Sequence, residues 1–287
     1  MMSVTIEKRT KRPAVADPDL LDDTPRDVIA WADSYRAGAV LKQHRHRRAQ
    51  LLYAVSGVMT VTTPEGSWVV PPHRAVWVPP ATDHSIRMSS AVSMRTLYVE
   101  PTAAASLPAR CCVVSVPPLL RELILRAMEL PLLYDTEGAE GRLIALILDE
   151  IRVLPALPLH LPVPSEPRLA KICGALLNHP EDGRALAEWA RGAGASGRTL
   201  ARLFRRETGM SFGAWRQQAR LIEALARLGA GKAVTNVALD LGYESPSAFT
   251  AMFRRSLGVT PSRYFEPPQS PAAERLHRLA PGMKSPA

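Results

Sequence analysis

The distribution of proline constrains the fold of this chain more than any other feature. Proline accounts for 26 of 287 residues, about 9% against a typical value of roughly 5%, yet none occurs from Glu181 to Ser245. Ala, Leu, Arg and Glu dominate this gap, with apolar residues at helical spacing, so it is predicted to be mostly helix. Upstream, prolines crowd residues 155–167 too densely for the interior of a helix or a sheet. We expect a stiff linker there.

Residues 30–100 contain short β-prone runs separated by turn residues, which predicts an all-β unit. Pro64-Glu65-Gly66 is typical of a hairpin connection, and the proline pairs at 71–72 and 79–80 end strands because proline donates no ladder hydrogen bond. Many short strands indicate a barrel or a sandwich. The runs are residues 51–55, 58–63, 67–70, 75–78 and 93–99.

Residues 101–154 change to a helical pattern. Leucine and isoleucine recur at three- and four-residue steps over residues 119–124 and 143–154, which predicts two amphipathic helices. Their apolar faces either cover the β unit or pair two subunits, and both alternatives stay open. Residues 1–29 and 267–287 are rich in charge, proline and alanine and are predicted to be disordered.

Hydropathy and cysteine content exclude several classes of protein. The chain has no run of 18 apolar residues and starts with polar residues, so we expect neither a membrane span nor secretion. Its three cysteines form no disulfide framework and have no metal-type spacing with histidine. These features predict a cytoplasmic protein.

The positive charge is concentrated in one third of the chain. Residues 168–266 hold 15 Lys and Arg against 8 Asp and Glu, a net +7 of the total +9. A concentrated excess of this kind is typical of a protein that binds a polyanion, although a solvated basic surface is an equal alternative on charge alone.

Two related segments lie 49 residues apart within this basic third. Leu203-Phe204-Arg205-Arg206 with Gly209 corresponds to Met252-Phe253-Arg254-Arg255 with Gly258. Ahead of each copy stand a short helical stretch, a glycine and a serine able to cap the next helix. The serine is Ser196 in the first copy and Ser245 in the second. The order predicts two helix-turn-helix units, at residues 184–207 and 234–256.

These residues resemble the DNA-binding domain of the AraC/XylS family of transcription regulators. The resemblance covers about residues 168–266 and is most specific from Val237 to Phe249, continuing through Phe253, Gly258 and Tyr264. It implies a seven-helix domain that places two recognition helices in successive major grooves. The 18 residues from Ser211 to Leu228 would span roughly 27 Å as a helix, close to the roughly 34 Å between adjacent major-groove segments.

The two recognition helices are predicted to contribute unequally. Opposite its expected buried face, the first helix carries three arginines. The positions 49 residues later, on the second helix, hold a serine, an alanine and one arginine. We expect the first unit to discriminate bases and the second to dock mainly on the DNA backbone. The predicted DNA-binding residues are Ser196, Arg198, Thr199, Arg202, Arg205, Arg206, Ser245, Ser247, Thr250, Arg254 and Arg255.

Histidines gather in the β unit. Strand alternation places His44 and His46 on one face, where two imidazoles can reach one ion, and His84 from a later strand could complete the set. The spacing, with Gln50 and Gly57, resembles the two motifs of the cupin superfamily. Metal-binding cupins have a glutamate at the position of Gln50 and a glycine at that of Ala81. A neutral amide is a poor ligand for catalytic iron, so a zinc, nickel or copper ion is expected if the site holds metal; the alternatives are a polar small-molecule pocket and no site.

The predicted fold class is α+β and multidomain: a cupin-like β-barrel with following helices, then an all-α domain of two helix-turn-helix units. The predicted function is a transcription regulator, activator or repressor, in which a small molecule or metal ion controls operator binding. We expect a homodimer, contact with double-stranded DNA and with RNA polymerase, and no membrane partner. The alternatives are a cupin enzyme, such as a dioxygenase or isomerase, with an accessory DNA-binding domain, and a constitutive DNA-binding protein with a β scaffold.

Overall fold

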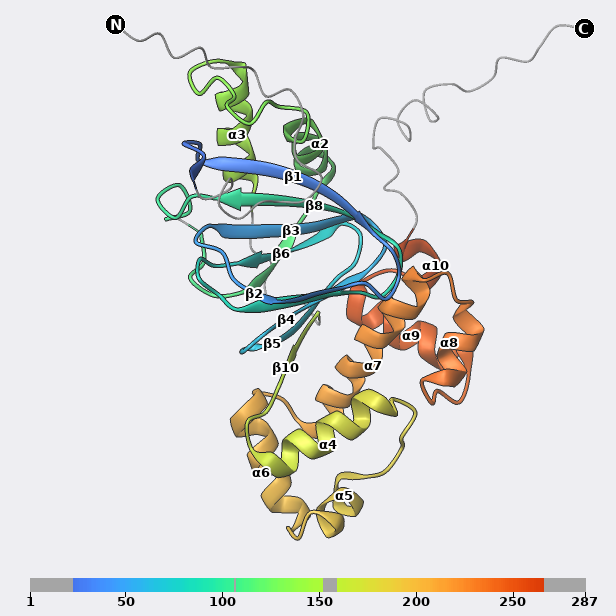
Figure 1. Cartoon of the computed structure of the whole chain (residues 1–287). Coiled ribbons are helices and arrows are strands. Elements are labelled where there is room, and N and C mark those ends of the chain that lie inside the picture. The colour runs from blue at the N-terminus through green and yellow to red at the C-terminus, as the bar shows by residue number, and fades with distance from the viewer. Residues whose placement is uncertain (1–22, 106, 152–158, 266–287) are drawn as a thin grey trace, which may run out of the picture.

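The computed structural model describes residues 23–105, 107–151 and 159–265 (Figure 1). Most of the two tails predicted to be disordered lies outside these residues. The first strand begins at Val28, two residues before the predicted start of the β unit.

Two five-stranded antiparallel sheets pack face to face and form the β domain (Figure 1). Leu52 and Val76 of the first sheet share one core with Val61 and Ile86 of the second. Sheet A has the order β1 (Val28–Tyr35), β8 (Val92–Val99), β3 (Ala49–Ser56), β6 (Arg74–Val78) and β9 (Cys112–Ser115). Sheet B has the order β10 (His160–Pro162), β5 (Gly66–Val70), β4 (Met59–Thr63), β7 (His84–Met88) and β2 (Val40–His44).

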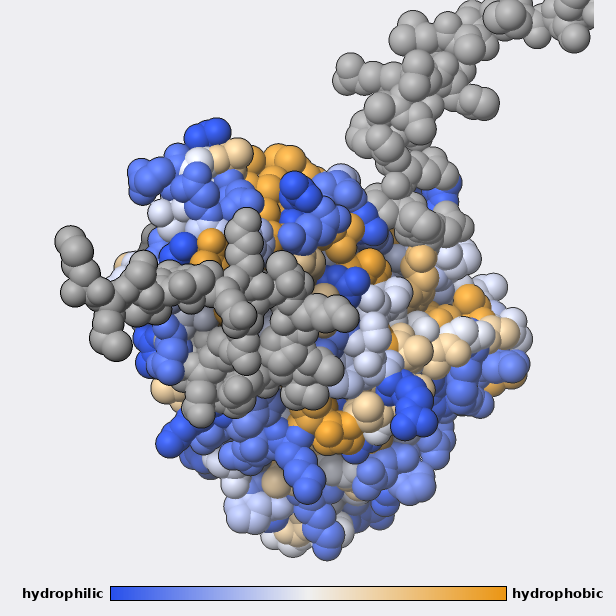
Figure 2. Space-filling model, turned by 45° about the horizontal axis from the view of Figure 1, so that its top comes forward, coloured by the Kyte–Doolittle hydropathy of each residue, from blue (hydrophilic) through white to orange (hydrophobic). Residues whose placement is uncertain are grey.

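Two helices cover the outer face of sheet A. They are α2 (Pro118–Ala127) and α3 (Ala139–Glu150), and Leu120 and Ile147 from them pack with Leu51 and Trp77 of the sheet. Strand β3 is therefore buried on both faces, which explains its nearly continuous apolar sequence. Figure 2 shows apolar patches that interrupt the polar surface of the protein. Covering the sheet leaves other leucines of this segment exposed: Leu119, Leu133 and Leu146.

The segment predicted as a linker contains a strand. Residues 152–158 lie outside the described residues, but β10 extends sheet B by pairing with β5. The density of prolines excluded the interior of a sheet and predicted a stiff linker. Strand β10 lies at the edge of the described sheet, and an edge position tolerates Pro162, which has no N–H to donate to another strand.

The described residues after β10 are mainly helical, and those from Glu181 to Ser245 were predicted so from the absence of proline. The helices are α4 (Pro167–Asn178), α5 (Leu186–Gly192), α6 (Gly197–Thr208), α7 (Phe212–Gly229), α8 (Val234–Asp240), α9 (Pro246–Leu257) and α10 (Pro261–Tyr264). The α+β class, a β domain with following helices and then two helix-turn-helix units, is confirmed. Among the described helices, none combines the length and the apolar character needed to cross a bilayer.

Helix α7 connects the two helix-turn-helix units and also contacts the β domain (Figure 1). Trp215, near its start, belongs to the core of the first unit, with Leu200 and Phe204. Leu225, near its end, belongs to a core that the second unit shares with the β domain. The position of α7 therefore sets the position of both units.

Candidate functional site

Serine caps start both recognition helices. Ser196 Oγ accepts a hydrogen bond from the Thr199 backbone N–H of α6 at 3.1 Å, and Ser245 Oγ accepts one from Ala248 of α9 at 3.2 Å. Each cap satisfies an N–H group that the helix leaves unpaired. Ser196 and Ser245 thus have a structural role at the predicted positions, in addition to the DNA contacts predicted for them.

Glycines close the turns of the two units in corresponding ways. Gly194 and Gly242 precede the recognition helices with φ of 61° and 72°, a left-handed conformation that disfavours a side chain. At Gly242 a β-carbon would also lie 2.7 Å from the Glu181 carbonyl oxygen. The 49-residue repeat therefore reflects a repeated backbone geometry.

The predicted DNA-binding residues of α6 and α9 lie on exposed or half-buried positions. On α6, Leu200 and Phe204 are fully buried while the predicted arginines are at the surface. One of them, Arg206, forms an ion pair with Glu207 at 3.0 Å, which reduces its attraction for a phosphate. The exposed predicted residues are Ser196, Arg198, Arg202, Arg205 and Arg206 of the first unit, and Ser247, Arg254 and Arg255 of the second; Thr199, Ser245 and Thr250 are half-buried.

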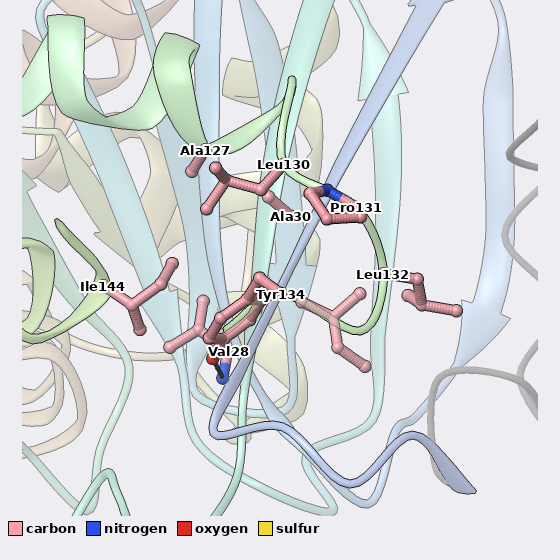
Figure 3. Close-up of a pocket in the computed structure, with 9 residues that line it drawn as sticks. Val28, Ala30, Ala127, Leu130, Pro131, Leu132, Tyr134 and Ile144 are labelled. Carbon is pink, nitrogen blue, oxygen red and sulfur yellow. Dashed lines mark hydrogen bonds between the residues drawn. The ribbon is translucent and has the colours of Figure 1, made fainter. Parts of the chain in front are cut away.

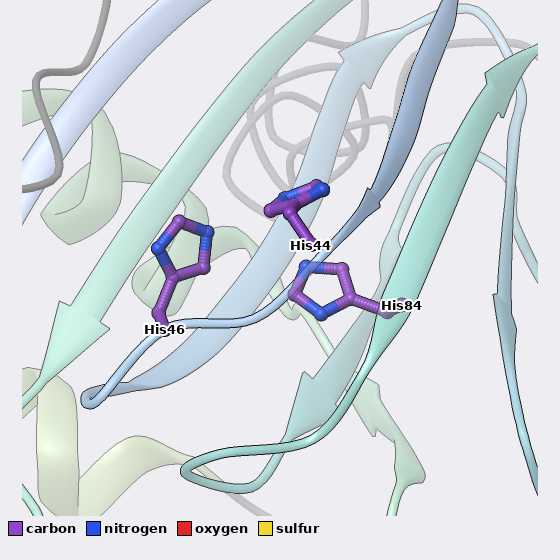
Figure 4. A group of neighbouring side chains, drawn as sticks. All are labelled: His44, His46 and His84. Atoms are coloured by element: carbon purple, nitrogen blue, oxygen red, sulfur yellow. The ribbon is translucent and has the colours of Figure 1, made fainter.

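Three predicted histidines meet inside the β domain (Figure 4). Possible ligand atoms of His44, His46 and His84 all lie within 4.8 Å of one another. His44 and His84 are cross-strand partners on β2 and β7, with ring centroids 4.3 Å apart. We call these three residues the histidine cluster.

The route by which His46 joins the cluster differs from the prediction. Strand β2 ends at His44, and its pairing with β7 is irregular between Leu41 and His44. His46 therefore lies in the connection to β3 and not on the same strand face as His44. It still approaches the cluster, with its ring centroid 5.0 Å from that of His44.

Backbone carbonyls fix the orientation of two of the rings. His44 Nδ1 lies 2.6 Å from the Lys42 carbonyl oxygen, and His84 Nδ1 lies 2.9 Å from that of Thr82. A carbonyl oxygen only accepts, so each Nδ1 carries a proton, and in the neutral form of such a ring the lone pair is on Nε2. This arrangement is typical of histidines that bind a metal through Nε2.

Buried nitrogens in the cluster have no hydrogen-bond partner among the described residues. They are Nε2 of His46 and Nε2 of His84, whose residue is 1% exposed. Burial, with the neighbouring histidines, lowers the pKa of His46 to about 4, and burial also lowers the pKa of His84. Both rings are therefore neutral near pH 7 and can donate a lone pair.

Gln50 lies on the opposite sheet, and Tyr98, which the sequence did not indicate, stands between it and the histidine cluster. Gln50 on β3 is 2% exposed, and its Oε1 has no hydrogen-bond partner among the described residues. Its side chain interacts with Tyr98, its cross-strand partner on β8, and the Tyr98 ring centroid lies 5.2 Å from that of His46. The register of β3 and β8 places Tyr98 opposite Gln50, and no residue in the sequence of β8 had indicated a site. Ala81, where cupins have glycine, takes the left-handed φ of 56°.

A separate pocket lies between β1 and the segment joining α2 to α3 (Figure 3). Its lining is apolar except for the Tyr134 hydroxyl, which lies 3.4 Å from the Val28 N–H. It contains none of the residues predicted for a site. We therefore place the candidate ligand site at the histidine cluster.

Known protein families match both the N-terminal β domain and the C-terminal helical domain of this chain. A family model described as the AraC-like ligand binding domain matches residues 32–191, and a helix-turn-helix domain model matches residues 189–266. The HTH-type transcriptional regulator NimR of Escherichia coli is 41% identical over 221 residues, which are 77% of this chain and 81% of NimR.

Two further proteins are similar over different extents. The HTH-type transcriptional regulator RipA of Corynebacterium glutamicum is 35% identical over 103 residues, 36% of this chain and 31% of RipA. A solved structure of ToxT from Vibrio cholerae aligns with a TM-score of 0.35 at 10% identity, over 84% of this chain and 98% of ToxT.

Proposed function

The chain belongs to the AraC family of transcription regulators, and from that membership we propose that α6 and α9 bind an operator and that the histidine cluster controls this binding. The two exposed helices begin at matched caps and are joined by the 18 residues of α7. An 18-residue helix is roughly 27 Å long, which suits two adjacent major-groove segments. We assign DNA binding to residues 168–266.

We propose that α6 supplies most of the base discrimination. Arg198 and Arg202 stand on its exposed face, away from the Glu207 ion pair, and arginine can form bidentate hydrogen bonds to guanine. The equivalent positions on α9 carry Ser247 and Ala251, which suit contacts with the backbone or with thymine methyl groups. Arg254 then holds a phosphate.

A divalent transition metal ion is the effector that the histidine cluster fits best. The observation that supports this proposal is a pair of buried Nε2 atoms that have no hydrogen-bond partner in the described part of the chain, one of them in a ring whose Nδ1 hydrogen-bonds a backbone carbonyl. Buried polar atoms normally have a partner, and a metal ion would supply one. His44, His46 and His84 would hold it.

The donor set favours zinc, nickel or copper. Imidazole nitrogens suit these three ions, whereas Gln50 offers a neutral amide in place of a carboxylate. When bound, the ion supplies a positive charge that joins ligands from β2, the β2–β3 connection and β7. We propose no catalytic activity, because the curated relatives are transcription regulators.

The exposed leucines of the covering helices support a homodimer. Leu119 of α2 is 51% exposed and Leu146 of α3 is 41% exposed, although both helices bury their opposite faces on sheet A. We propose that this surface pairs two subunits and so places two DNA-binding domains on repeated half-sites. As an operator-binding regulator the protein would act in the cytoplasm and contact RNA polymerase there.

Calorimetric titration of the metal-free protein with zinc, nickel and copper salts tests the metal proposal. We expect one site per chain for at least one ion, and loss of that site in His84→Ala. The exposed histidine His179 provides the matched control, since His179→Ala must bind like the wild type. Absence of binding in the wild type, or unchanged binding in His84→Ala, would refute the metal site and favour an organic ligand.

A further inference from the structure

Strand β10 contacts both the β domain and the DNA-binding domain. It completes sheet B, with Leu161 opposite Ser67 and Pro162 opposite Gly66 of β5. Its other side lies against α7 of the DNA-binding domain, between the β domain and the helices in Figure 1. Leu161 is 2% exposed, because its side chain enters the core of the first helix-turn-helix unit.

Two side chains of α7 bind the backbone of this strand. The Trp215 indole Nε1–H donates to the Pro162 carbonyl oxygen at 2.9 Å, and the Gln218 amide donates to the His160 carbonyl oxygen. Both acceptors lie on a strand that has no further strand on that side in the described sheet. Side chains of α7 thus satisfy backbone carbonyls of β10 that a further strand would otherwise bind.

Trp215 also contacts the buried face of the first recognition helix. It is 1% exposed, and its ring centroid lies 6.1 Å from that of Phe204 on α6, in an edge-to-face arrangement. A continuous series of contacts therefore runs from sheet B through Pro162 and Trp215 to Phe204. Such packed, hydrogen-bonded contacts can transmit a displacement between sites.

The histidine cluster lies toward the opposite edge of the same sheet. His44 is on β2 and His84 on β7, while β10 is at the far end of the order β10-β5-β4-β7-β2. A change in how β2 and β7 pair can therefore reach β10 through the hydrogen-bonded strands between them.

We infer that Trp215 and Gln218 are positioning residues that hold α6 in a fixed orientation relative to sheet B, so that the state of the β domain sets operator affinity through β10. This inference rests on the proposed binding of DNA by α6. It does not depend on the identity of the effector. The two residues act on DNA only through the position of α6.

A double-mutant cycle on the full chain tests this coupling. Gly66→Ala perturbs the sensor side, because a β-carbon at Gly66 would lie 2.6 Å from both His160 Nε2 and the Leu161 carbonyl oxygen. The double change Trp215→Phe with Gln218→Ala removes both donors and keeps an aromatic ring against Phe204. Operator affinity is measured for each variant and for the combination, on a sequence selected from random DNA by the wild type.

We expect each perturbation alone to weaken operator binding by roughly fivefold or more, and the combination to weaken it by no more than about twofold beyond the larger single effect. The inference would be overturned if the two perturbations changed operator affinity independently, so that their effects multiplied. It would also be overturned if Gly66→Ala left operator affinity unchanged. If Gly66→Ala does not fold by circular dichroism, His160→Ala replaces it, since that ring stacks on Trp68 at 4.3 Å and anchors β10.

Gln217→Ala is the matched control, because it makes the same change at the exposed neighbour of Gln218. The effects of Gln217→Ala and Gly66→Ala on operator affinity must multiply, because Gln217 takes no part in the proposed coupling. A wild-type protein that selects no DNA sequence would refute the proposed function together with this inference. Selection of a sequence combined with multiplying effects in the main cycle would refute the inference alone.

Discussion

Val58, at the turn between β3 and β4, packs against Gly229, the last residue of α7. A β-carbon at Gly229 would lie 2.3 Å from Val58 Cγ2, well inside van der Waals contact. Val58 is fully buried, in the core that the β domain shares with the second helix-turn-helix unit. The end of α7 therefore approaches the β domain so closely that only glycine fits.

We predict that Gly229→Ala destabilises the protein by about 1–3 kcal/mol, the usual cost of overpacking a tight contact. Urea denaturation measures the change in the free energy of unfolding. Gly213→Ala on the same helix is the control, because no atom lies within 4 Å of a β-carbon there, and we expect it to stabilise by about 0.5–1 kcal/mol.

Shortening the opposing side chain should reduce the destabilisation caused by Gly229→Ala. In a Val58→Ala background, Gly229→Ala should cost much less than it does alone, because the γ-methyl it meets is absent. Equal costs in the two backgrounds would show that the Val58–Gly229 contact does not limit the docking of α7.

The histidine cluster predicts a loss of stability in acid. The pKa of His46 is about 4 in the folded protein against 6.5 for an unperturbed histidine, so the unfolded state binds the proton more tightly. The contribution to stability is complete above pH 6.5 and is lost as the pH falls toward 4.

Urea denaturation in EDTA at several pH values between 7.5 and 4 measures this dependence. His46→Asn should lose less stability than the wild type over this interval. The exposed control His179→Asn should follow the wild type. Parallel curves for His46→Asn and the wild type would contradict the assigned direction of the pKa.

Gln50→Glu should raise metal affinity and lower metal-free stability. A carboxylate is a stronger metal ligand than an amide, so if this buried side chain reaches the ion we expect affinity for zinc to rise roughly tenfold or more. Without metal the buried charge has no counter-ion and the melting temperature should fall. Thermal unfolding of Gln50→Glu and the wild type is measured in EDTA and in zinc. A change in melting temperature of the same sign in both conditions would place Gln50 outside the site.

Substitution of single arginines should separate base contacts from phosphate contacts. Arg202→Ala on α6 should relax sequence preference at one position, at a cost of about 1–3 kcal/mol for the preferred base. Arg254→Ala on α9 should weaken binding to all DNA sequences alike. It should also reduce the slope of log affinity against log salt concentration by about 1. Binding selections and salt titrations distinguish the two, and the reverse outcome would exchange the roles assigned to the helices.

Local sequence signals predicted the helical half well. The caps at Ser196 and Ser245 and the left-handed glycines act within a few residues, so spacing alone located both helix-turn-helix units. The β half was less accessible. Strands β1, β9 and β10 were not among the predicted runs, and β2 and β7 were expected only as the strands that carry the histidines. Strand β10 has three residues and ends in a proline, too few for an alternating pattern to show.

The spacing of the histidines indicated a candidate site, but its predicted local geometry was wrong in one respect. Strand alternation predicted His44 and His46 on one face, whereas β2 ends at His44 and the β2–β3 connection carries His46. The contacts of Trp215 and Gln218 with β10 were also inaccessible, because they depend on how two domains pack.

Operator affinity with and without zinc tests the central claim most directly. The full-length protein is titrated onto a selected operator in EDTA and then in zinc, alongside His84→Ala. We predict that zinc changes the dissociation constant of the wild type by about fivefold or more, a coupling of about 1 kcal/mol, and leaves that of His84→Ala unchanged. Identical affinity of the wild type in EDTA and in zinc, with zinc bound, would contradict control of DNA binding by the histidine cluster.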